Sequence, residues 1–332
     1  MSKLLSRIGQ LFVVGFPGRK PSSAFLNFVQ EENIGGIILF RANCPTHQTI
    51  QKNVQLIRDA ASLSTPFIAV DQEGGRVCRV TGAPAEYASA TEYGSRLGVD
   101  RFAEEFGRGA LCLEQLGINL ILGPVADIFL DDRNDCLRDR CFGTNPQQVA
   151  PFVRKAVEIS KRNGLLCCVK HFPGLGAAQA DPHHETPVVD YDELIWDQRE
   201  KLPFAAGVEQ GADFVMTTHV RIPRIDDQIT TGSQKTIELL LRGCLAFDGP
   251  VITDDLTMQG AACLGHIGER TVAAFNAGHD VLLFGQDIEA SMEAFEYFKD
   301  AFLRGEISSS RINNALDRVA GIKFKLGNSV IF

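Results

Sequence analysis

Short apolar runs alternate with amphipathic segments along the chain, and this alternation limits the folds open to the sequence. Eight apolar runs predict strands: Gly9–Val14, Ile34–Phe40, Pro66–Asp71, Ile118–Val125, Leu165–Lys170, Asp213–Thr217, Pro250–Asp254 and Asp280–Phe284. Amphipathic stretches predict helices: Ser22–Glu32, His47–Ser62, Arg101–Leu116, Pro146–Arg162, Asp192–Gly207, Gln234–Leu245, Ile267–Ala277, Ile288–Leu303 and Ser308–Phe324. This order favours a (β/α)8 barrel of the α/β class, and an open doubly wound sheet is the competing architecture.

The positions of polar residues support the barrel. Asp71, Asp127, Lys170, His219 and Asp254 each lie at or just past the carboxyl end of a predicted strand. In a barrel these ends meet at one mouth, so residues far apart in the sequence come together there. No linker rich in Ser, Pro or Gly divides the chain. We therefore expect residues 1–332 to form a single α/β domain, a TIM barrel.

Composition and charge exclude several classes of protein. A net charge of -8 and a pI of about 5.4 argue against a nucleic-acid-binding surface. The apolar run 11–16 is too short for the core of a signal peptide, and no window approaches roughly 18 uninterrupted apolar residues, so no membrane association is expected. Nine cysteines, an odd number without a C-x-x-C pair, are typical of free thiols in a reducing compartment. We expect a cytoplasmic protein.

The loop after the fifth predicted strand carries the sequence KHFPGLGAAQADPH, residues 170–183. An apolar run that ends in charged residues and a Gly/Pro loop indicates a buried strand that delivers its tip to a site. Asp181 and His183 lie two positions apart, a spacing at which a carboxylate can orient and charge an imidazole and make it a proton shuttle. A surface loop with two unrelated polar residues is the alternative.

Two adjacent carboxylates follow the seventh predicted strand. Asp254 ends the apolar run 251–253, and Asp255 comes next. A carboxylate at a strand tip in a barrel mouth can attack an electrophilic carbon, whereas an Asp in this place can also cap the next helix. We expect each residue to take one of these roles, with Asp254 as the reactive group because it lies on the strand end itself.

Further candidates for ligand binding lie near other strand ends. Asp71 and Arg79 suit hydrogen bonding to a polyhydroxylated ligand, with a local ion pair as the alternative. Arg140 could reach an anionic or carbonyl group, whereas a solvated loop is expected for its neighbour Arg138. Met216 and His219 end another strand, where a lone His is more often a structural hydrogen-bonding residue than a catalyst.

The sequence gives no support for a metal or a cofactor. Asp181, His183, His184, Asp254 and Asp255 could in principle be ligands, but nothing matches H-x-H or HExxH spacing, so no catalytic metal is expected. No G-x-G-x-x-G or P-loop pattern follows a strand, so nucleotide binding is unsupported. We expect no cofactor.

At these residues the chain resembles glycoside hydrolase family 3, and within it the single-domain bacterial β-N-acetylhexosaminidases of cell-wall recycling. The matching stretches are GGIILF (35–40), VDQEGGRV (70–77), LGINLILGPVADI (116–128), RCFGTNP (140–146), KHFPGLG with DPH (170–183) and VITDDLTM (251–258). The 170–183 motif is the most specific of them. The resemblance implies a (β/α)8 barrel that hydrolyses glycosides with retention of configuration.

The resemblance also implies roles for individual residues. Asp254 would be the nucleophile that forms a covalent glycosyl-enzyme, His183 the general acid/base, and Asp181 its partner. The substrate-binding residues would hold N-acetylglucosamine in the outermost subsite: Asp71, Arg79, Arg140, Lys170 and His171, to which we add Met216 and His219 as expectations. The implied substrate is a small carbohydrate, a GlcNAc-containing glycoside from peptidoglycan-derived 1,6-anhydro-muropeptides.

Three features depart from the family pattern. Leu175 lies where many relatives carry His, Ala177 and Ala178 replace a common polar pair, and Pro182 replaces the usual Ser or Thr between Asp181 and His183. Proline fixes its own φ and pushes the preceding residue towards extended conformations. Our hypothesis is that Pro182 stiffens a loop that otherwise moves to deliver His183.

Other functions remain open at the level of sequence. A family 3 β-glucosidase or β-xylosidase is one, although by resemblance those enzymes usually take their acid/base from a second domain. A GlcNAc phosphorylase is another, because a neutral His repels phosphate less than a carboxylate does. A catalytically silent sugar-binding barrel is the alternative that is not an enzyme, and the combined presence of Asp254, Asp181 and His183 argues against it.

Overall fold

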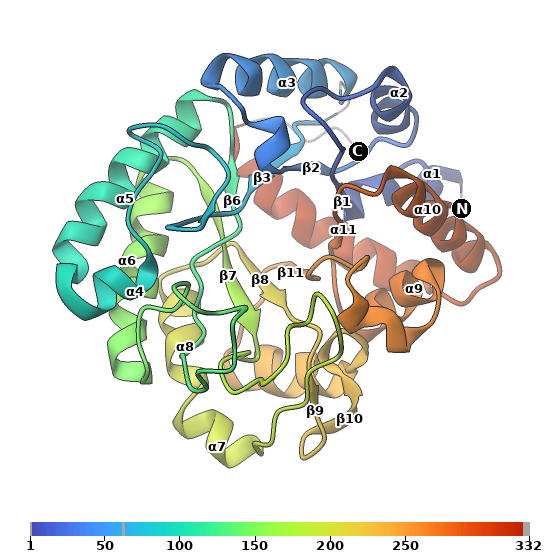
Figure 1. Ribbon diagram of the computed structural model, residues 1–332. Helices are drawn as coiled ribbons and strands as arrows, with labels where there is room; N and C mark the ends of the chain where they lie inside the picture. The colour runs from blue at the N-terminus through green and yellow to red at the C-terminus, as the bar shows by residue number, and fades with distance from the viewer. Residues whose placement is uncertain (1, 62–63, 328–332) are drawn as a thin grey trace.

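The computed structural model describes residues 2–61 and 64–327. All eight predicted strands are present as the parallel strands of one barrel, although most are shorter than predicted. They are β1 (Phe12–Val14), β2 (Gly36–Leu39), β3 (Phe67–Val70), β6 (Leu120–Ile121), β7 (Leu166–Phe172), β8 (Phe214–Thr217), β11 (Val251–Ile252) and β12 (Leu282–Phe284). Helices form an outer ring around these strands (Figure 1).

The strand order closes on itself, which distinguishes the barrel from an open sheet. Neighbours follow the order β11-β8-β7-β6-β3-β2-β1-β12. The two end strands then meet, because Ile252 and Val281 form a parallel bridge and the Thr253 N–H donates to the Val281 carbonyl at 3.1 Å. The chain therefore forms a (β/α)8 TIM barrel, as predicted, and all strand tips converge on one mouth.

Several helices of the outer ring begin next to residues whose side chains cap the helix N-terminus. Ser22, Thr46 and Asn145 each accept a backbone N–H from the first turn of the helix that follows, and Pro146 occupies the first position after Asn145. The longer helices are α2 (Ser23–Glu31), α3 (His47–Ala60), α5 (Gly98–Gln115), α6 (Pro146–Arg162), α8 (Lys201–Glu209), α9 (Ile267–Ala277), α10 (Ile288–Leu303) and α11 (Ser309–Phe324).

Shorter elements fill the connections. The helical turns are α1 (Ser2–Leu5), η1 (Ile8–Leu11), η2 (Arg41–Asn43), α4 (Ala90–Glu92), η3 (Tyr93–Leu97), α7 (Glu193–Gln198), η4 (Thr230–Gly232), η5 (Thr236–Cys244) and η6 (Gln259–Leu264). Two hairpins extend the loops after β3 and β8: β4 (Gln72–Gly74) with β5 (Val77–Cys78), and β9 (Arg221–Ile222) with β10 (Asp226–Ile229). The β4–β5 hairpin directly follows the tip of β3.

The predicted helix Asp192–Gly207 is wrong as a single element. It is divided into α7 and α8, with the break at Arg199. Pro203 has no N–H to donate to the Arg199 carbonyl, and its ring crowds that carbonyl, so a continuous helix is disfavoured at this point. Pro203 instead lies in the first turn of α8, where its missing N–H costs nothing.

Two other predicted elements differ from the structure in character as well as in their bounds. The first three residues of the predicted strand Gly9–Val14 belong to the turn η1, because Gly9 packs directly against the Glu32 carbonyl and a Cβ there would lie 1.8 Å from that oxygen. The predicted helix Gln234–Leu245 is the wider helix η5, in which the Leu245 N–H donates to the Leu240 carbonyl, five residues back. Ser62, the last residue of a predicted helix, lies outside the described residues.

The core fills the barrel and the layer between strands and helices. The barrel strands are buried along their length, and Phe67 and Phe214 meet edge to face inside the barrel at 5.3 Å. Among the residues that the structure describes, no helix is long and apolar enough to cross a membrane.

Candidate active site

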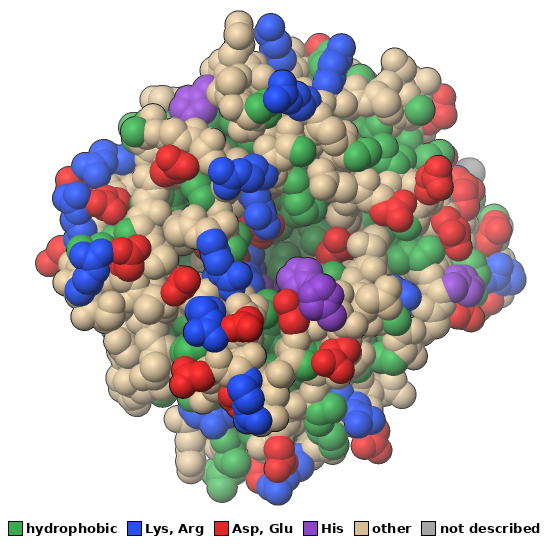
Figure 2. Space-filling view, in the orientation of Figure 1, with side chains coloured by type: hydrophobic (Ala, Val, Ile, Leu, Met, Phe, Trp, Pro, Cys, Tyr) green, Lys and Arg blue, Asp and Glu red, His purple; other side chains and the backbone are tan. Residues whose placement is uncertain are grey.

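A cavity of about 290 Å³ lies at the carboxyl ends of the barrel strands. Nearly all of the residues singled out from the sequence line it: Asp71, Arg79, Arg140, Lys170, His171, Asp181, His183, Met216 and Asp254. Figure 2 shows this hollow near the centre of one face, with His, basic and acidic side chains gathered around it. Among the residues expected to take part in catalysis or substrate binding, His219 alone does not line the cavity.

Asp254 follows β11 and reaches the cavity with its carboxylate partly exposed. One carboxylate oxygen accepts the N–H of Asp255 at 2.8 Å. Burial acts to raise the pKa of Asp254, but the imidazoles of His219 and His171, the Asp255 N–H and the Lys170 ammonium together hold it below its usual value. The group is therefore a carboxylate at neutral pH, the form that a nucleophile requires.

Asp255 and His219 form a support behind Asp254. One Asp255 oxygen accepts the N–H of Thr257 at 2.9 Å and its hydroxyl at 2.7 Å, which fixes the turn after β11. The next helix, η6, begins after Met258 without a side-chain cap, so the expectation that one member of the pair caps that helix is wrong. His219 is fully buried, and its ring joins the Thr231 hydroxyl at 2.6 Å to the Asp255 backbone carbonyl at 2.9 Å. Since both ring nitrogens have partners inside the protein, His219 acts on the site by fixing the backbone after Asp254.

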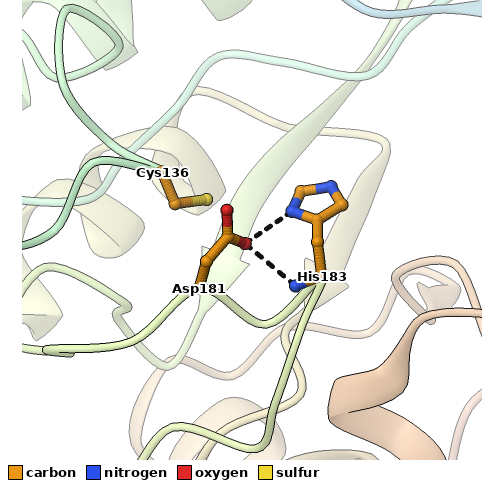
Figure 3. A group of neighbouring side chains, drawn as sticks. All are labelled: Cys136, Asp181 and His183. Carbon is orange, nitrogen blue, oxygen red and sulfur yellow. Dashed lines mark hydrogen bonds and ion pairs between the residues drawn. The ribbon is translucent and has the colours of Figure 1, made fainter.

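Asp181 and His183 form a dyad in the loop after β7. The Asp181 carboxylate accepts the backbone N–H of His183 at 2.9 Å, and the same oxygen lies 2.6 Å from Nδ1 of the ring (Figure 3). Desolvation acts to raise the pKa of Asp181, but these two hydrogen bonds lower it below its usual value. Because Asp181 engages Nδ1, Nε2 is the nitrogen left for exchange of a proton with a ligand.

A buried network of cations and carboxylates forms one wall. Lys170 Nζ lies 2.7 Å from both Asp71 and Glu73. Arg140 binds Glu73 through two nearly parallel hydrogen bonds of 2.8 and 2.9 Å. Burial alone would lower the pKa of Lys170, but Asp71 and Glu73 raise it above its usual value, so the ammonium stays charged. This wall presents fixed donors and acceptors to a polyhydroxylated ligand.

His171 is held in one orientation by the fully buried Asp127. Its Nδ1 lies 2.6 Å from Asp127, and Arg140 donates to Nε2 at 3.2 Å, which places the ring proton on Nδ1. The other Asp127 oxygen accepts the N–H of Leu175 at 2.7 Å. Asp127 therefore fastens the end of β7 to the loop that carries the dyad.

Arg79 and Met216 also line the cavity. An Arg79 nitrogen lies 3.6 Å from the Asp71 carboxylate, and about a quarter of the Arg79 side chain, 28%, remains exposed. Met216 is the third residue of β8 and contributes an apolar surface to the same cavity. Sugars present both hydroxyl edges and apolar faces, and this lining offers partners for both.

The sequence reasoning missed Glu73 and named Asp127 only as a residue at a strand end. Glu73 is the carboxylate that pairs with both Arg140 and Lys170. The available signal was its spacing, because residues two apart in an extended segment point to the same side, and Asp71 precedes Glu73 by two. For Asp127 the signal was the polar residue after the apolar run 118–125, and nothing in that run indicated His171 as its partner.

A parallel barrel with a sugar-sized polar cavity, a strand-tip carboxylate and an Asp–His pair defines a hydrolase of the glycosidase class. The pattern of the glycosyl hydrolase family 3 N terminal domain matches residues 3–322. The chain belongs to this family, and it is a glycoside hydrolase that acts on carbohydrate substrates.

Known proteins that resemble the chain carry consistent names. A beta-hexosaminidase of Xanthomonas axonopodis pv. citri is 31% identical over 82% of this chain and 83% of its own length, and one of Xanthomonas oryzae pv. oryzae is 34% identical over the same shares. The solved structure of a family 3 beta-N-acetylglucosaminidase from Paenibacillus has a TM-score of 0.94 and 30% identity; the match covers 99% of this chain and 64% of that one. A beta-N-acetylhexosaminidase structure from Beutenbergia cavernae matches with a TM-score of 0.88 and 26% identity over 97% of this chain and 98% of its own.

Proposed function

We propose that the protein is a retaining exo-β-N-acetylglucosaminidase. The observation that carries this proposal is that one barrel brings Asp254 and the Asp181–His183 dyad to the same cavity. Asp254 would be the nucleophile, and His183 would be the acid/base that retaining glycosidases more often draw from a second carboxyl group. The names of the relatives support N-acetylhexosamine as the sugar.

In the first step, the Asp254 carboxylate attacks the anomeric carbon while Nε2–H of the His183 imidazolium protonates the departing glycosidic oxygen. The bond between sugar and aglycone breaks, and an ester bond to Asp254 forms. Asp181 stabilises the imidazolium before this transfer through its bond to Nδ1. In the second step, Nε2 takes a proton from water, the water oxygen attacks the anomeric carbon, and the Asp254 carboxylate is released.

The outermost subsite would be formed by the wall of paired charges. Asp71, Arg79, Arg140, Lys170 and His171 line the cavity together, and Glu73 and Asp127 hold three of them in place. Donors and acceptors fixed in this way favour a sugar with several hydroxyl groups at defined positions. Met216 would pack against an apolar face of the sugar, whereas His219 would act through the backbone after Asp254.

We further propose that the substrates are peptidoglycan-derived 1,6-anhydro-muropeptides, processed in the cytoplasm by residues 1–332 as a single catalytic domain. The resemblance to cell-wall recycling enzymes supports the substrate. The cysteines support a reducing compartment, because Cys167 and Cys168 lie side by side in β7 as buried thiols, the usual state of cysteines in such compartments. The shared cavity supports a single domain, since both proposed catalytic groups come from the same barrel.

The competing activities differ in their substrates. A β-glucosidase or β-xylosidase would act on sugars that lack the acetamido group, and a phosphorylase would use phosphate in place of water. A silent sugar-binding barrel would have no use for an ionised Asp254 beside a proton shuttle, and the geometry favours an enzyme over it.

The test compares p-nitrophenyl β-N-acetylglucosaminide with the matching glucoside, each in phosphate and in phosphate-free buffer. We expect hydrolysis of the N-acetyl substrate alone, equal rates in both buffers, and no turnover by Asp254→Ala. Faster release from the glucoside would favour the glucosidase, and formation of a sugar phosphate would favour the phosphorylase. No turnover by the folded wild-type protein on either substrate would leave the binding role.

A further inference from the structure

Cys136 lies beside the dyad in the same cavity. It comes from the loop between β6 and α6, whereas Asp181 and His183 come from the loop after β7, and Figure 3 shows the Cys136 sulfur pointing towards the Asp181 carboxylate. One ligand atom from each residue, the thiol sulfur, a carboxylate oxygen and a ring nitrogen, lies within 4.8 Å of the other two. We call these three residues the Cys–Asp–His cluster.

The cluster offers donors that suit a thiophilic divalent cation. Zn²⁺ binds Cys sulfur at about 2.3 Å and His nitrogen or carboxylate oxygen at about 2.0–2.2 Å, usually with four ligands. Two ligands of one tetrahedral ion stand roughly 3.3–3.6 Å apart at such bond lengths. To bind one ion, the Asp181 oxygen and His183 Nδ1, now 2.6 Å apart, need to separate by less than about 1 Å. The two most widely separated of the three ligand atoms need to approach each other by a similar distance.

The cluster is reachable, and the nearby cations are already paired. The side chains of His183 and Asp181 are 57% and 32% exposed, and Cys136 lines the cavity that they border. Arg140 and Lys170, which would repel a cation, are bound to Glu73. Arg140 also donates through Nη1 to the Cys136 sulfur at 3.5 Å, and this contact must open when a cation binds. Burial raises the pKa of the Cys136 thiol to about 12, so a cation must displace the thiol proton, as Zn²⁺ does when it binds cysteine. Hard cations such as Mg²⁺ gain little from sulfur.

We propose that the Cys–Asp–His cluster binds one thiophilic divalent cation such as Zn²⁺ and that the bound cation inhibits the enzyme. The cation would take the lone pair of Nδ1, whose proton leaves to solvent together with that of the thiol. Nε2 then keeps the only proton of a neutral ring. His183 could then protonate a leaving oxygen only by becoming an imidazolate. It could not accept a proton from water, because both ring nitrogens are occupied. Binding does not depend on the proposed function, whereas inhibition rests on the proposed role of His183.

The sequence did not indicate this site, because its three ligands follow no linear spacing. Only Asp181 and His183 are neighbours in the sequence, and a pair of ligands is not a metal motif. The fold supplies the third ligand from a separate loop. This proposal departs from the expectation of no metal, and the cation proposed here opposes catalysis.

Cobalt(II) tests the binding directly, since a thiolate ligand gives Co²⁺ a sulfur-to-metal charge-transfer absorption in the near ultraviolet. We expect this absorption to saturate at one equivalent in the wild-type protein and in the control Cys244→Ser, which changes an exposed cysteine on η5. It should be absent in Cys136→Ser. His183→Ala, a change at a half-exposed side chain, should weaken Co²⁺ binding at least tenfold. An unchanged absorption in Cys136→Ser, or its loss in Cys244→Ser, would overturn the proposal.

Inhibition is measured as the Zn²⁺ concentration that halves hydrolysis of p-nitrophenyl β-N-acetylglucosaminide, each variant being compared with its own metal-free rate. We expect Cys136→Ser to raise this concentration at least tenfold relative to the wild type and Cys244→Ser, and a chelator to restore the rate. If the wild-type protein binds Co²⁺ but hydrolyses nothing, the proposed function fails and the site stands. If it hydrolyses and a bound equivalent of Zn²⁺ leaves the rate unchanged, the inhibitory role is refuted.

Discussion

Glu73 is the residue on which the binding wall depends most, and Glu73→Gln tests this directly. The side chain is only 3% exposed and satisfies two buried cations, Arg140 through two hydrogen bonds and Lys170 at 2.7 Å. Glutamine keeps the shape of the side chain and removes the charge. Arg140 would then retain no carboxylate as its direct partner, and Lys170 would retain only Asp71.

The expected cost in stability follows from that geometry. Removal of one partner from a buried ion pair destabilises a protein by roughly 3–5 kcal/mol, because the remaining charge stays buried. Glutamine can still accept one hydrogen bond, so we expect a value near the lower end, about 3 kcal/mol. For a chain of 332 residues, this corresponds to a fall of about 4 °C in melting temperature.

The pH dependence gives a second signature. Burial acts to raise the pKa of Glu73, but Arg140 and Lys170 hold it well below the usual value of about 4.5. A carboxyl group whose pKa is lowered by folding stabilises the folded state above its unfolded pKa, and this contribution is lost as the pH falls. The difference in unfolding free energy between wild type and Glu73→Gln should therefore be full at neutral pH and shrink below about pH 4.5.

The assay is urea unfolding of the wild type, Glu73→Gln and the control Glu209→Gln across this pH range. Glu209 pairs with Arg154 on the surface, where both side chains are about half exposed, so its change should cost less than about 1 kcal/mol. Equal unfolding free energies for the two variants at neutral pH would refute the reasoning. A cost for Glu73→Gln that does not change with pH would refute the electrostatic cause.

Three further predictions concern residues around the site and at the base of the barrel. Burial raises the pKa of Glu200 to about 7, so the folded chain holds more protons than the unfolded chain between about pH 4.5 and 7. The free energy of unfolding should therefore fall as the pH rises through that range. Glu200→Gln should abolish this fall, as measured by urea unfolding. Burial lowers the pKa of Lys323 to about 7, so the unfolding free energy should rise with pH from about 7 towards 10.5. Lys323→Met should flatten that rise. If either Glu200→Gln or Lys323→Met leaves the pH dependence of the unfolding free energy unchanged, the pKa shift proposed for that residue is wrong. The Pro182 carbonyl accepts the Gly260 N–H at 2.9 Å; Pro182→Ser should speed hydrogen exchange in this loop and raise turnover about threefold, and the stiffening hypothesis is wrong if neither changes.

The arrangement of the strands was predictable because it depends on local patterns. Apolar runs with polar residues at their ends marked all eight barrel strands, although most of the predicted strands extend beyond the observed ones. The start of the first strand was not predictable, because Gly9 enters a turn to approach the Glu32 carbonyl, a contact between distant segments. The break at Arg199 lies four residues before Pro203, but a proline alone does not predict a break, because α6 continues through Pro151.

The site was predictable where its residues stand at strand tips and obscure where their roles depend on partners. Asp254 and Lys170 could be selected by their positions at strand ends, and Asp181 by its spacing of two residues from His183. Glu73 acquires its role from two cations contributed by distant segments, and Cys136 acquires its neighbours only when two loops meet. His219 shows the opposite case, since its position at a strand end suggested contact with a ligand, whereas its ring is occupied by Thr231 and the Asp255 carbonyl.

The central proposal is that Asp254 and His183 perform the two halves of one reaction in one barrel. His183→Ala should still form the glycosyl-enzyme from p-nitrophenyl β-N-acetylglucosaminide, because nitrophenolate leaves without protonation, but it should hydrolyse the ester slowly for want of a base. Mass spectrometry of the acid-quenched variant, followed by peptide mapping, should find one N-acetylglucosaminyl group on Asp254. The absence of an adduct during turnover, or an adduct on Asp255 or another carboxylate, would contradict the account.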